Sequence, residues 1–229
     1  MAYYNTINRV TRLSLGTKHS APLFLYSANY EEMTQMAKSG DWDAFARVYT
    51  DAVEILASKV DAVVICAVMP HKVSGRLQRC LAPLNLPLLH IADCVGRYLQ
   101  TQHPRIGILG LLGPKITMLG GDDPDFFIGR LQSRDLDIQV LVPETTAELD
   151  EVNRGMMDEV TKGMSVVTPL TKDMFVRNAL RLVDRGAQAI LLGSTDLGFS
   201  IKQSDLGKDI LVVDPTSVHA VEVVKWALG

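Results

Sequence analysis

Short apolar runs alternate with longer amphipathic stretches along this chain. The runs are rich in Val, Ile and Leu and are bounded by Pro, Gly or polar residues, a pattern typical of parallel strands buried on both faces. The stretches between them have the length and periodicity of crossover helices. The alternation therefore predicts an α/β fold with parallel sheets. The predicted strands are residues 22–27, 61–66, 87–91, 105–110, 138–142, 188–193 and 210–213.

Two of the amphipathic stretches predict helices most clearly. Residues 42–58 repeat apolar side chains at helical spacing, with Phe45 and Ala52 on one stripe. Residues 173–184 do the same, and Gly186 then ends the helix.

The chain repeats one order of parts. In each half a helix leads into a strand, a turn, a second strand and a further helix, with the first pair of strands at 61–66 and 87–91 and the second at 188–193 and 210–213. We expect two lobes related by a pseudo-twofold axis, with the site in the cleft between them, because ligands of open parallel sheets bind at the carboxyl ends of strands. The alternative is that any α/β chain looks self-similar at this level. The predicted lobes are residues 1–100 with 214–229, and residues 101–213.

Composition narrows the classes of function. The 229 residues are 47% hydrophobic and 21% charged, with 23 basic against 26 acidic side chains and a net charge of −3. The electrostatic field of so small a net charge is too weak to attract nucleic acid, which argues against nucleic acid as a partner. The apolar runs are far shorter than the roughly 20 residues of a membrane helix, which argues against a membrane protein. Cys66, Cys80 and Cys94 have no CxxC spacing, which argues against zinc and disulfides and favours the reducing cytoplasm.

Several short segments spread along the chain carry a further signal when they are taken together. They are Tyr3-Tyr4, Ile7-Asn8, His71-Lys72-Val73, Leu89-His90-Ile91-Ala92-Asp93, Leu109-Gly110, Thr117-Met118, Arg154-Gly155, Arg185-Gly186-Ala187, residues 193–197 and Asp214-Pro215. In these the chain resembles the aspartate/glutamate racemase family, close to its broad-specificity amino-acid racemases. The resemblance implies two Rossmann-like lobes, a homodimer, and racemisation of an acidic amino acid such as aspartate or glutamate without pyridoxal phosphate, metal or other cofactor.

Racemisation of this kind needs two opposed groups. A base on one face of the α-carbon removes the proton, and an acid on the other face returns it. A cysteine thiol can take either part, whereas a serine hydroxyl hardly ionises and an alanine carries no exchangeable proton. One thiol in each lobe meets this requirement.

The first thiol position is changed in this chain. The family turn reads Cys-Asn-Thr-x-His, and counting back four residues from His71 gives Ala67. Val68 then stands at the asparagine position and Met69 at the threonine position. The threonine that one branch of the family carries at the first position is also missing. The resemblance therefore implies a first-lobe turn without its acid/base group and without two polar side chains that would bind substrate.

The second thiol position is changed as well. The family sequence Gly-Cys-Thr-Glu corresponds to Gly193, Ser194, Thr195 and Asp196. Ser194 replaces the thiol and Asp196 shortens the glutamate, so Thr195 is the intact member. Thr195 and Asp196 are the expected substrate contacts in this lobe.

Other candidates have two interpretations each. Cys66 could replace the first thiol if a bulge turned its sulfur into the cleft, but an apolar strand end usually buries its cysteine. His71 could touch the cleft or bond the backbone. Thr117 matches a family threonine that binds a substrate carboxylate, or it caps a helix. His90 and His219 lie in apolar surroundings, where we expect core or helix-face histidines.

The start of the chain also differs from the family. Members begin with a strand and a Gly-Gly-Met loop before the Tyr-Tyr helix, whereas Met1 here falls almost on Tyr3. Either the first strand is lost, which would leave its neighbour unpaired, or a longer natural chain is truncated.

These observations leave three hypotheses. The chain is a racemase by descent whose catalysis is impaired at Ala67 and Ser194, or a non-catalytic relative that binds a small dicarboxylate or a protein partner. The third is a different reaction that uses His71 or Cys66.

Overall fold

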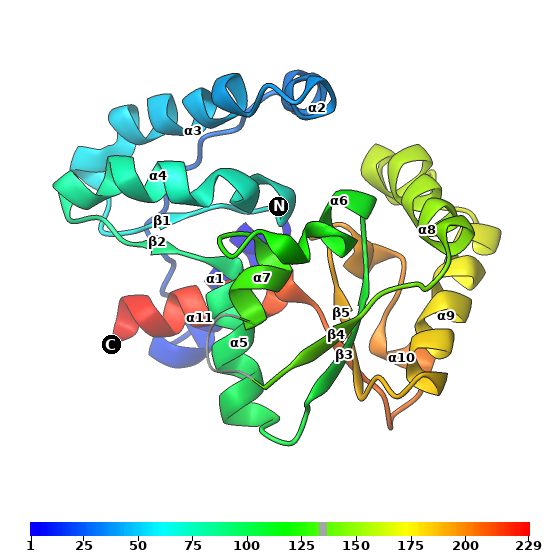
Figure 1. The fold of residues 1–229 in the computed structure, drawn as a ribbon. Helices are drawn as coiled ribbons and strands as arrows, with labels where there is room; N and C mark the ends of the chain where they lie inside the picture. The colour runs from blue at the N-terminus through cyan, green and yellow to red at the C-terminus, as the bar shows by residue number, and fades with distance from the viewer. Residues whose placement is uncertain (133–136) are drawn as a thin grey trace.

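In a computed structural model, this chain folds into two groups of parallel strands, each flanked by helices (Figure 1). The structure describes residues 1–132 and 137–229. Within these residues one sheet has the order β1-β2 and the other the order β4-β3-β5-β6, and every pairing is parallel. The α/β prediction is confirmed. The strands are β1 (Val63–Val64), β2 (Leu88–Leu89), β3 (Ile108–Leu112), β4 (Gln139–Leu141), β5 (Ala189–Leu192) and β6 (Leu211–Val213).

The helices begin and end where local sequence signals place them. Asp41 and Thr168 accept hydrogen bonds from the first turns of α3 and α9, and Gly186 follows α9 with a φ of 102°. Both predicted helices are thus confirmed, although α3 ends at Leu56 rather than at 58 and α9 begins at Pro169 rather than at 173. None of the described helices has the length and apolar character needed to cross a bilayer. They are α1 (Ala2–Leu15), α2 (Tyr30–Ser39), α3 (Trp42–Leu56), α4 (Ser74–Leu81), α5 (Ile91–Gln102), α6 (Lys115–Met118), α7 (Phe127–Gln132), α8 (Thr146–Asp158), α9 (Pro169–Asp184), α10 (Gln203–Leu206) and α11 (Pro215–Leu228).

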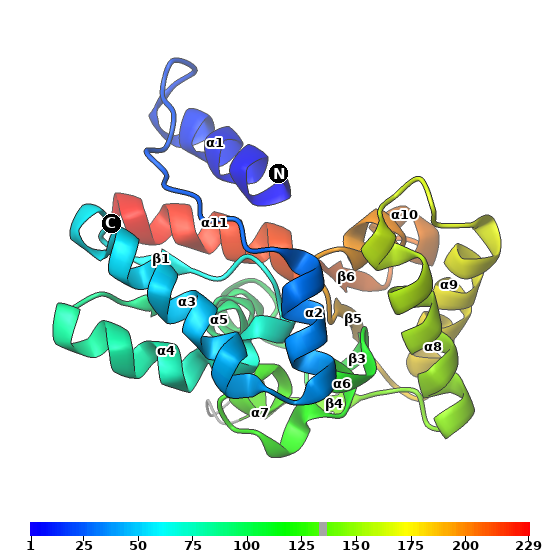
Figure 2. The same cartoon turned by 90° about the horizontal axis from the view of Figure 1, so that it is seen from above.

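Helices cover both faces of β1 and β2. Val64 packs against an apolar cluster that joins α1 to α11 through Tyr3, Ile7, Ala220 and Val224. The opposite face packs against α3 and α4. In Figure 2 these two pairs of helices lie on either side of the sheet.

The second sheet has a larger and continuous core. Its strands lie between α5 and α7 on one face and α8 and α9 on the other (Figure 1). Every residue of β5 is buried, as are Leu109, Leu111 and Leu112 of β3. The continuous apolar runs that predicted these strands are therefore explained by helices on both faces.

One predicted strand is wrong. Within the described chain, residues 22–27 form no strand, and Leu23, Phe24, Leu25 and Tyr26 are all exposed. The apolar run has strand-like composition, but an extended segment becomes a strand only when a neighbour accepts its backbone hydrogen bonds. The other six predicted strands are present with shifted or shorter bounds.

Candidate functional site

The turns at the carboxyl ends of β1 and β5 come together near the N-terminus of the chain. Desolvation raises the pKa of Cys66 in the first turn and of Asp196 in the second, and the α-ammonium of Met1 opposes the rise at both. Val68 of the first turn also packs in the same apolar cluster as Leu197, which follows the second turn. Figure 1 marks this end of the chain between β1 and α6. The cleft predicted from the internal repeat is therefore the candidate site.

The first-lobe turn presents little polar chemistry. The chain bends at residues 66–68 and then enters a 3₁₀ turn, Met69–Val73. Val68 is only 2% exposed and belongs to the same apolar core as the second lobe, whereas Met69 packs on the cluster formed by α2 and α3. Ala67 is partly exposed. Val68 and Met69 are the two expected substrate contacts in this turn, and Val68 is instead a packing residue of the core.

Cys66 is exposed, so the expectation that the strand end buries it is wrong. The cause is local, because β1 ends at Val64 and the backbone is already bent at residue 66. Strand alternation no longer sets the direction of this side chain. Protein atoms nevertheless displace water around the sulfur and raise the pKa of the thiol to about 11. Cys66 is consequently a protonated thiol at neutral pH, able to donate a proton but not to abstract one.

His71 bonds the backbone with both ring nitrogens. It is fully buried, its Nδ1 donates to the Ala67 carbonyl at 2.8 Å, and its Nε2 accepts from the Ile91 N–H at 3.3 Å. These two partners fix the neutral tautomer, and burial lowers the pKa of the ring to about 3. The ring holds the first-lobe turn against the start of α5 and has no nitrogen left for substrate.

His71 belongs to a buried polar cluster with Tyr3, His90 and His219. His219 donates from Nε2 to the Leu89 carbonyl at 2.8 Å, so its Nδ1 accepts the Tyr3 hydroxyl, also at 2.8 Å. Ring centroids of His71 lie 4.3 Å from His90 and 6.2 Å from His219. The prediction that His90 and His219 are core histidines is confirmed. Through His219 the cluster ties α1 and α11 to the end of β2.

The second-lobe turn depends on close contact between two glycines. Gly193 donates to the Leu112 carbonyl at 2.6 Å, and a Cβ added to Gly113 would lie 2.9 Å from backbone atoms of Gly193. Side chains larger than hydrogen do not fit there. The Ser194 hydroxyl oxygen accepts the Asp196 N–H at 3.3 Å, and the Thr195 carbonyl accepts the Thr216 hydroxyl at 3.2 Å. Ser194, Thr195 and Asp196 are all partly exposed at this edge.

Thr117 lies under the same turn. The helix α6 begins after Pro114 with no side-chain cap, so the capping interpretation of Thr117 is wrong. The residue is fully buried, and its Oγ1 has no hydrogen-bond partner among the described residues. Its Cγ2 would lie 3.2 Å from a Cβ placed on Gly193. A buried hydroxyl without a partner is costly, and a ligand oxygen would satisfy it.

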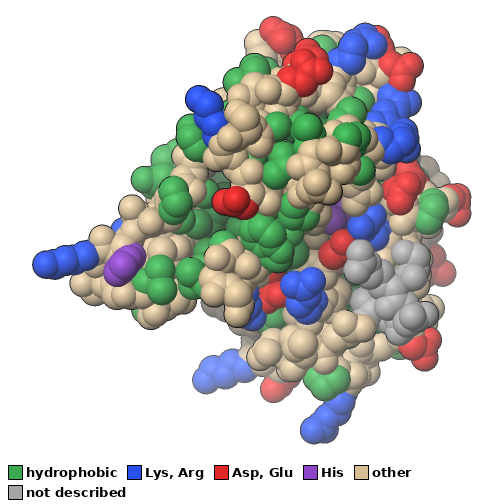
Figure 3. All heavy atoms as spheres, turned by 90° about the vertical axis from the view of Figure 1, so that its left-hand side faces the viewer, with side chains coloured by type: hydrophobic (Ala, Val, Ile, Leu, Met, Phe, Trp, Pro, Cys, Tyr) green, Lys and Arg blue, Asp and Glu red, His purple; other side chains and the backbone are tan. Residues whose placement is uncertain are grey.

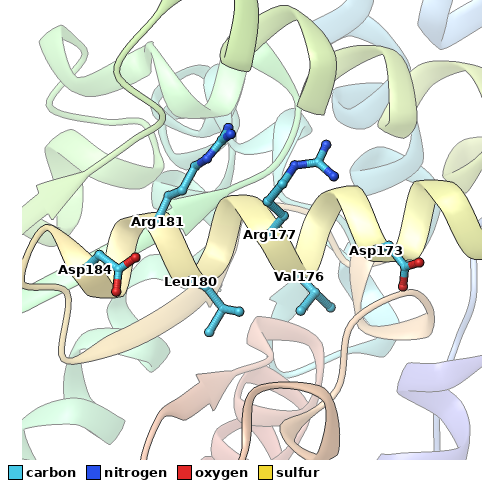
Figure 4. A pocket seen from close by; sticks show the side chains of 6 residues that line it. All are labelled: Asp173, Val176, Arg177, Leu180, Arg181 and Asp184. Atoms are coloured by element: carbon cyan, nitrogen blue, oxygen red, sulfur yellow. The ribbon is translucent and has the colours of Figure 1, made fainter.

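Other polar features lie away from these turns. A depression of about 360 Å³ runs along α9, lined by residues of that helix alone (Figure 4). Its arginines are already paired, Arg177 with Glu151 at 2.6 Å and Arg181 with Glu148 at 2.9 Å. In the described part of the chain, His, Cys, Asp and Glu form no group of three that could hold a metal ion.

Two features of the site were missed by sequence reasoning. The α-ammonium of Met1 acts to lower the pKa of both Cys66 and Asp196, and Arg130 binds Asp93 through two bonds of 2.7 and 2.9 Å that join α7 to the first turn of α5. Acidic residues are common in the first turn of a helix, so the sequence indicates where Asp93 lies. It does not indicate that Asp93 pairs with Arg130. A pairing over 37 residues is set by how the helices pack.

Comparisons with known proteins agree with this architecture. A sequence model of the Asp/Glu/hydantoin racemase family matches residues 1–223. A Yersinia pestis protein assigned as an Asp/Glu racemase is 30% identical, with a TM-score of 0.84 over 99% of this chain and 93% of its own. An aspartate racemase homologue from Pyrococcus horikoshii OT3 is 25% identical, with a TM-score of 0.77 over 100% and 93%. The aspartate racemase of Picrophilus torridus shares the fold at 15% identity, with a TM-score of 0.69 over 98% and 87%. The chain therefore belongs to the Asp/Glu/hydantoin racemase family.

Proposed function

We propose that this family member binds a small dicarboxylate in the cleft between its lobes and that its racemase activity is strongly impaired. The relatives above are described as Asp/Glu and aspartate racemases, and such amino acids carry two carboxylates. The unpartnered hydroxyl of Thr117 and the partly exposed residues Thr195 and Asp196 offer polar contacts for one end of such a molecule. The first-lobe wall, with Ala67 and Met69, offers mostly apolar contact.

The chemistry at two turn positions carries the proposal. Ala67 has no exchangeable proton, and the Ser194 hydroxyl is not an acid or base near neutral pH. Each positioned acid or base contributes roughly 10² to 10⁴ in rate, so losing both removes most of a two-base mechanism. The protein is on this view a pseudoenzyme that kept its binding cleft.

Proton exchange and binding together test the proposal. The protein is incubated with L- and D-aspartate and glutamate in deuterated water, and α-deuterium is followed by NMR beside an active family member. Calorimetry with aspartate, glutamate, succinate and maleate measures binding. We expect saturable binding of at least one dicarboxylate without α-deuterium. Exchange as fast as in the active relative would contradict the impairment, and failure of all four ligands to bind would favour a protein-binding role.

Thr117→Val supplies a matched variant, because it removes the hydroxyl and keeps the volume of the side chain. Loss of one hydrogen bond to a carboxylate predicts about tenfold weaker binding. Thr101→Val is the control, since Thr101 lies exposed on α5. Equal binding by both variants would remove Thr117 from the site.

A second candidate is residual proton transfer by Cys66 and Asp196. The observation that favours it is that Met1 acts on both groups, with one a protonated thiol and the other a carboxylate whose pKa is raised by desolvation. Such a pair could exchange an α-proton slowly, with Asp196 as base and Cys66 as acid. Any α-deuterium formed by the wild type is then lost in Cys66→Ala and retained in Cys80→Ala, whose thiol is exposed on α4.

The proposal includes a cytoplasmic homodimer. Cys66 and Cys80 are free and exposed, and exposed apolar side chains lie at or near the carboxyl ends of α3, α4 and α11, at Ile55, Leu84, Trp226 and Leu228. Figure 3 views the molecule from that side and shows hydrophobic side chains spread between charged ones. Sedimentation analysis of the wild type and of Trp226→Glu tests the dimer, and a monomeric wild type would contradict it.

A further inference from the structure

The segment that follows β3 begins at the candidate cleft and ends on the first lobe. Gly113 contacts Gly193, and the buried Thr117 lies under the second-lobe turn, so the start of the segment belongs to one wall. Residues 119–126 then lead into α7. Within them the Asp125 carbonyl accepts the hydroxyl of Ser74, a first-lobe residue, at 3.1 Å. One short segment of the second lobe therefore joins the two lobes beside the cleft.

Residues 119–126 are held in one shape by their own contacts. The Asp125 N–H donates to Asp123 Oδ1 at 3.1 Å, and the Phe126 N–H donates to the Asp123 carbonyl at 3.1 Å. Phe126 is fully buried, and a Cβ on Gly129 of α7 would collide with the Asp123 carbonyl. Backbone contact this close requires glycine at that position. The segment is therefore a rigid extension of α7.

Lys72 reaches this segment from the first lobe. Its Nζ lies 3.6 Å from Asp123 Oδ2, 5.5 Å from the centre of the Trp42 ring and 5.6 Å from the centre of the Phe126 ring. Both ring distances are within the range of a cation–π interaction. Trp42 begins α3 of the first lobe, whereas Asp123 and Phe126 belong to the second. The ammonium group therefore attracts groups from both lobes at once.

A second carboxylate of the segment lies at the start of α4. That helix begins after Val73, which provides no side-chain cap. A Cβ on Gly75 would lie 3.1 Å from Asp125 Oδ2, so the carboxylate is placed against the first turn of α4. A negative charge is favourable there because the first N–H groups of a helix have no partner within it. Residues 119–126 thus stabilise α4 only while they stay on the first lobe.

We propose that Lys72 is a positioning residue that holds residues 119–126 on the first lobe and thereby fixes the separation of the two cleft walls. Lys72 follows Met69 of the first-lobe turn by three positions, and Asp123 follows Thr117 of the other wall by six. The ion pair therefore joins positions that lie a few residues from each wall. The effect on ligand binding rests on the proposed function, whereas the effect on the separation does not.

Double electron–electron resonance between two spin labels measures the separation without a ligand. One label is attached to Cys80, which is exposed on α4 of the first lobe. The other is attached to Leu170→Cys, at a position 81% exposed near the start of α9 in the second lobe (Figure 1). The labelled chain carries Cys66→Ala, and Cys94 is buried, so only the two chosen positions react.

Three variants of this chain test the role of Lys72. Lys72→Met removes the charge and keeps most of the length, and we expect it to give a wider distribution of distances than the wild type. Lys72→Arg keeps a cation that can stack on aromatic rings, and we expect it to restore the narrow distribution. Lys172→Met is the control, because Lys172 pairs with Asp205 at 3.0 Å within the second lobe.

Two results would overturn the inference while circular dichroism shows the variants to be folded. One is the same distribution in Lys72→Met as in the wild type, and the other is failure of Lys72→Arg to restore it. Calorimetry on the unlabelled chains measures dicarboxylate binding, and we expect it to be about threefold weaker in Lys72→Met. Unchanged affinity beside a wider distribution would overturn the link to the ligand. A wild type that binds no dicarboxylate would contradict the proposed function, and the distances would still decide the role of Lys72.

Discussion

The two lobes share an order of elements but differ in how far each forms its own core. In residues 101–132 and 137–213, the second lobe has four strands between two layers of helices and one continuous apolar cluster. In the described part of the first lobe two short strands pair, and the buried apolar residues fall into three smaller clusters. Shared topology thus does not give equal packing.

The same contrast holds for the two walls of the cleft. The second-lobe wall keeps polar groups at Ser194, Thr195 and Asp196, over a buried glycine contact. In the first-lobe turn Ala67 is partly exposed, Met69 packs on the cluster formed by α2 and α3, and His71 is engaged with the backbone. On the proposed function, the polar second-lobe wall contributes most of the contacts for binding, and neither wall contributes the thiol that proton transfer would need.

The largest expected effect comes from restoring the chemistry on both walls. Ala67→Cys combined with Ser194→Cys puts a thiol at each family position, and one acid or base is worth roughly 10² to 10⁴ in rate. We expect α-deuterium incorporation into aspartate or glutamate to rise at least 10²-fold above the wild type, measured by NMR. Each single variant is the control and gains little. A folded, ligand-binding double variant without exchange would place the missing chemistry elsewhere.

Removing one phenylalanine from each core sharpens the comparison of stability. Phe45 and Phe175 are both 0% exposed, and Phe→Ala in a core costs about 3–5 kcal/mol. Trp42 lies 5.4 Å from Phe45 between ring centroids, so tryptophan fluorescence reports on the first lobe. In urea we expect Phe45→Ala to shift the fluorescence transition ahead of the far-UV dichroism transition. We expect Phe175→Ala to lower both midpoints together, and the reverse pattern would contradict separate cores.

Acid should weaken the contact of α1 and α11 with the first lobe. Burial lowers the pKa of His219 from 6.5 to about 4, so below pH 6.5 the unfolded state takes up a proton that the folded state does not. Stability is therefore full above pH 6.5 and falls by up to about 3 kcal/mol as the pH drops to about 4. Urea unfolding at several pH values measures the slope. His219→Gln makes it shallower, and the exposed His19→Gln leaves it unchanged.

The smallest effect on stability is expected from the loss of an ion pair on the surface of the second lobe. Arg181 and Glu148 pair at 2.9 Å between α8 and α9, with side chains 48% and 23% exposed. Exposed pairs contribute about 0.2–1 kcal/mol, so Arg181→Gln lowers the unfolding free energy by no more than that. The same variant leaves dicarboxylate binding unchanged, and a loss of binding would move the site to the depression along α9.

Local sequence signals predicted most of the fold but only part of the site. Helices α3 and α9 follow from periodicity and capping residues, which act within a few positions of the chain. The run at 22–27 has strand composition, yet it stays unpaired because a strand needs a neighbour that composition does not reveal. The exposure of Cys66 was likewise missed, since it depends on a bend two residues after β1 ends.

The sequence by itself determined the α/β class and the repeat of two lobes, and it predicted that Ala67 and Ser194 lie in the turns that face the cleft. Those properties are local, or depend on the order of elements along the chain. Only the tertiary structure decided that Val68 belongs to the core, that Cys66 is exposed, and that both ring nitrogens of His71 bind the backbone. Apart from the bond of His71 to Ala67, these outcomes depend on how residues far apart in sequence pack together, which the arrangement of helices and sheets fixes.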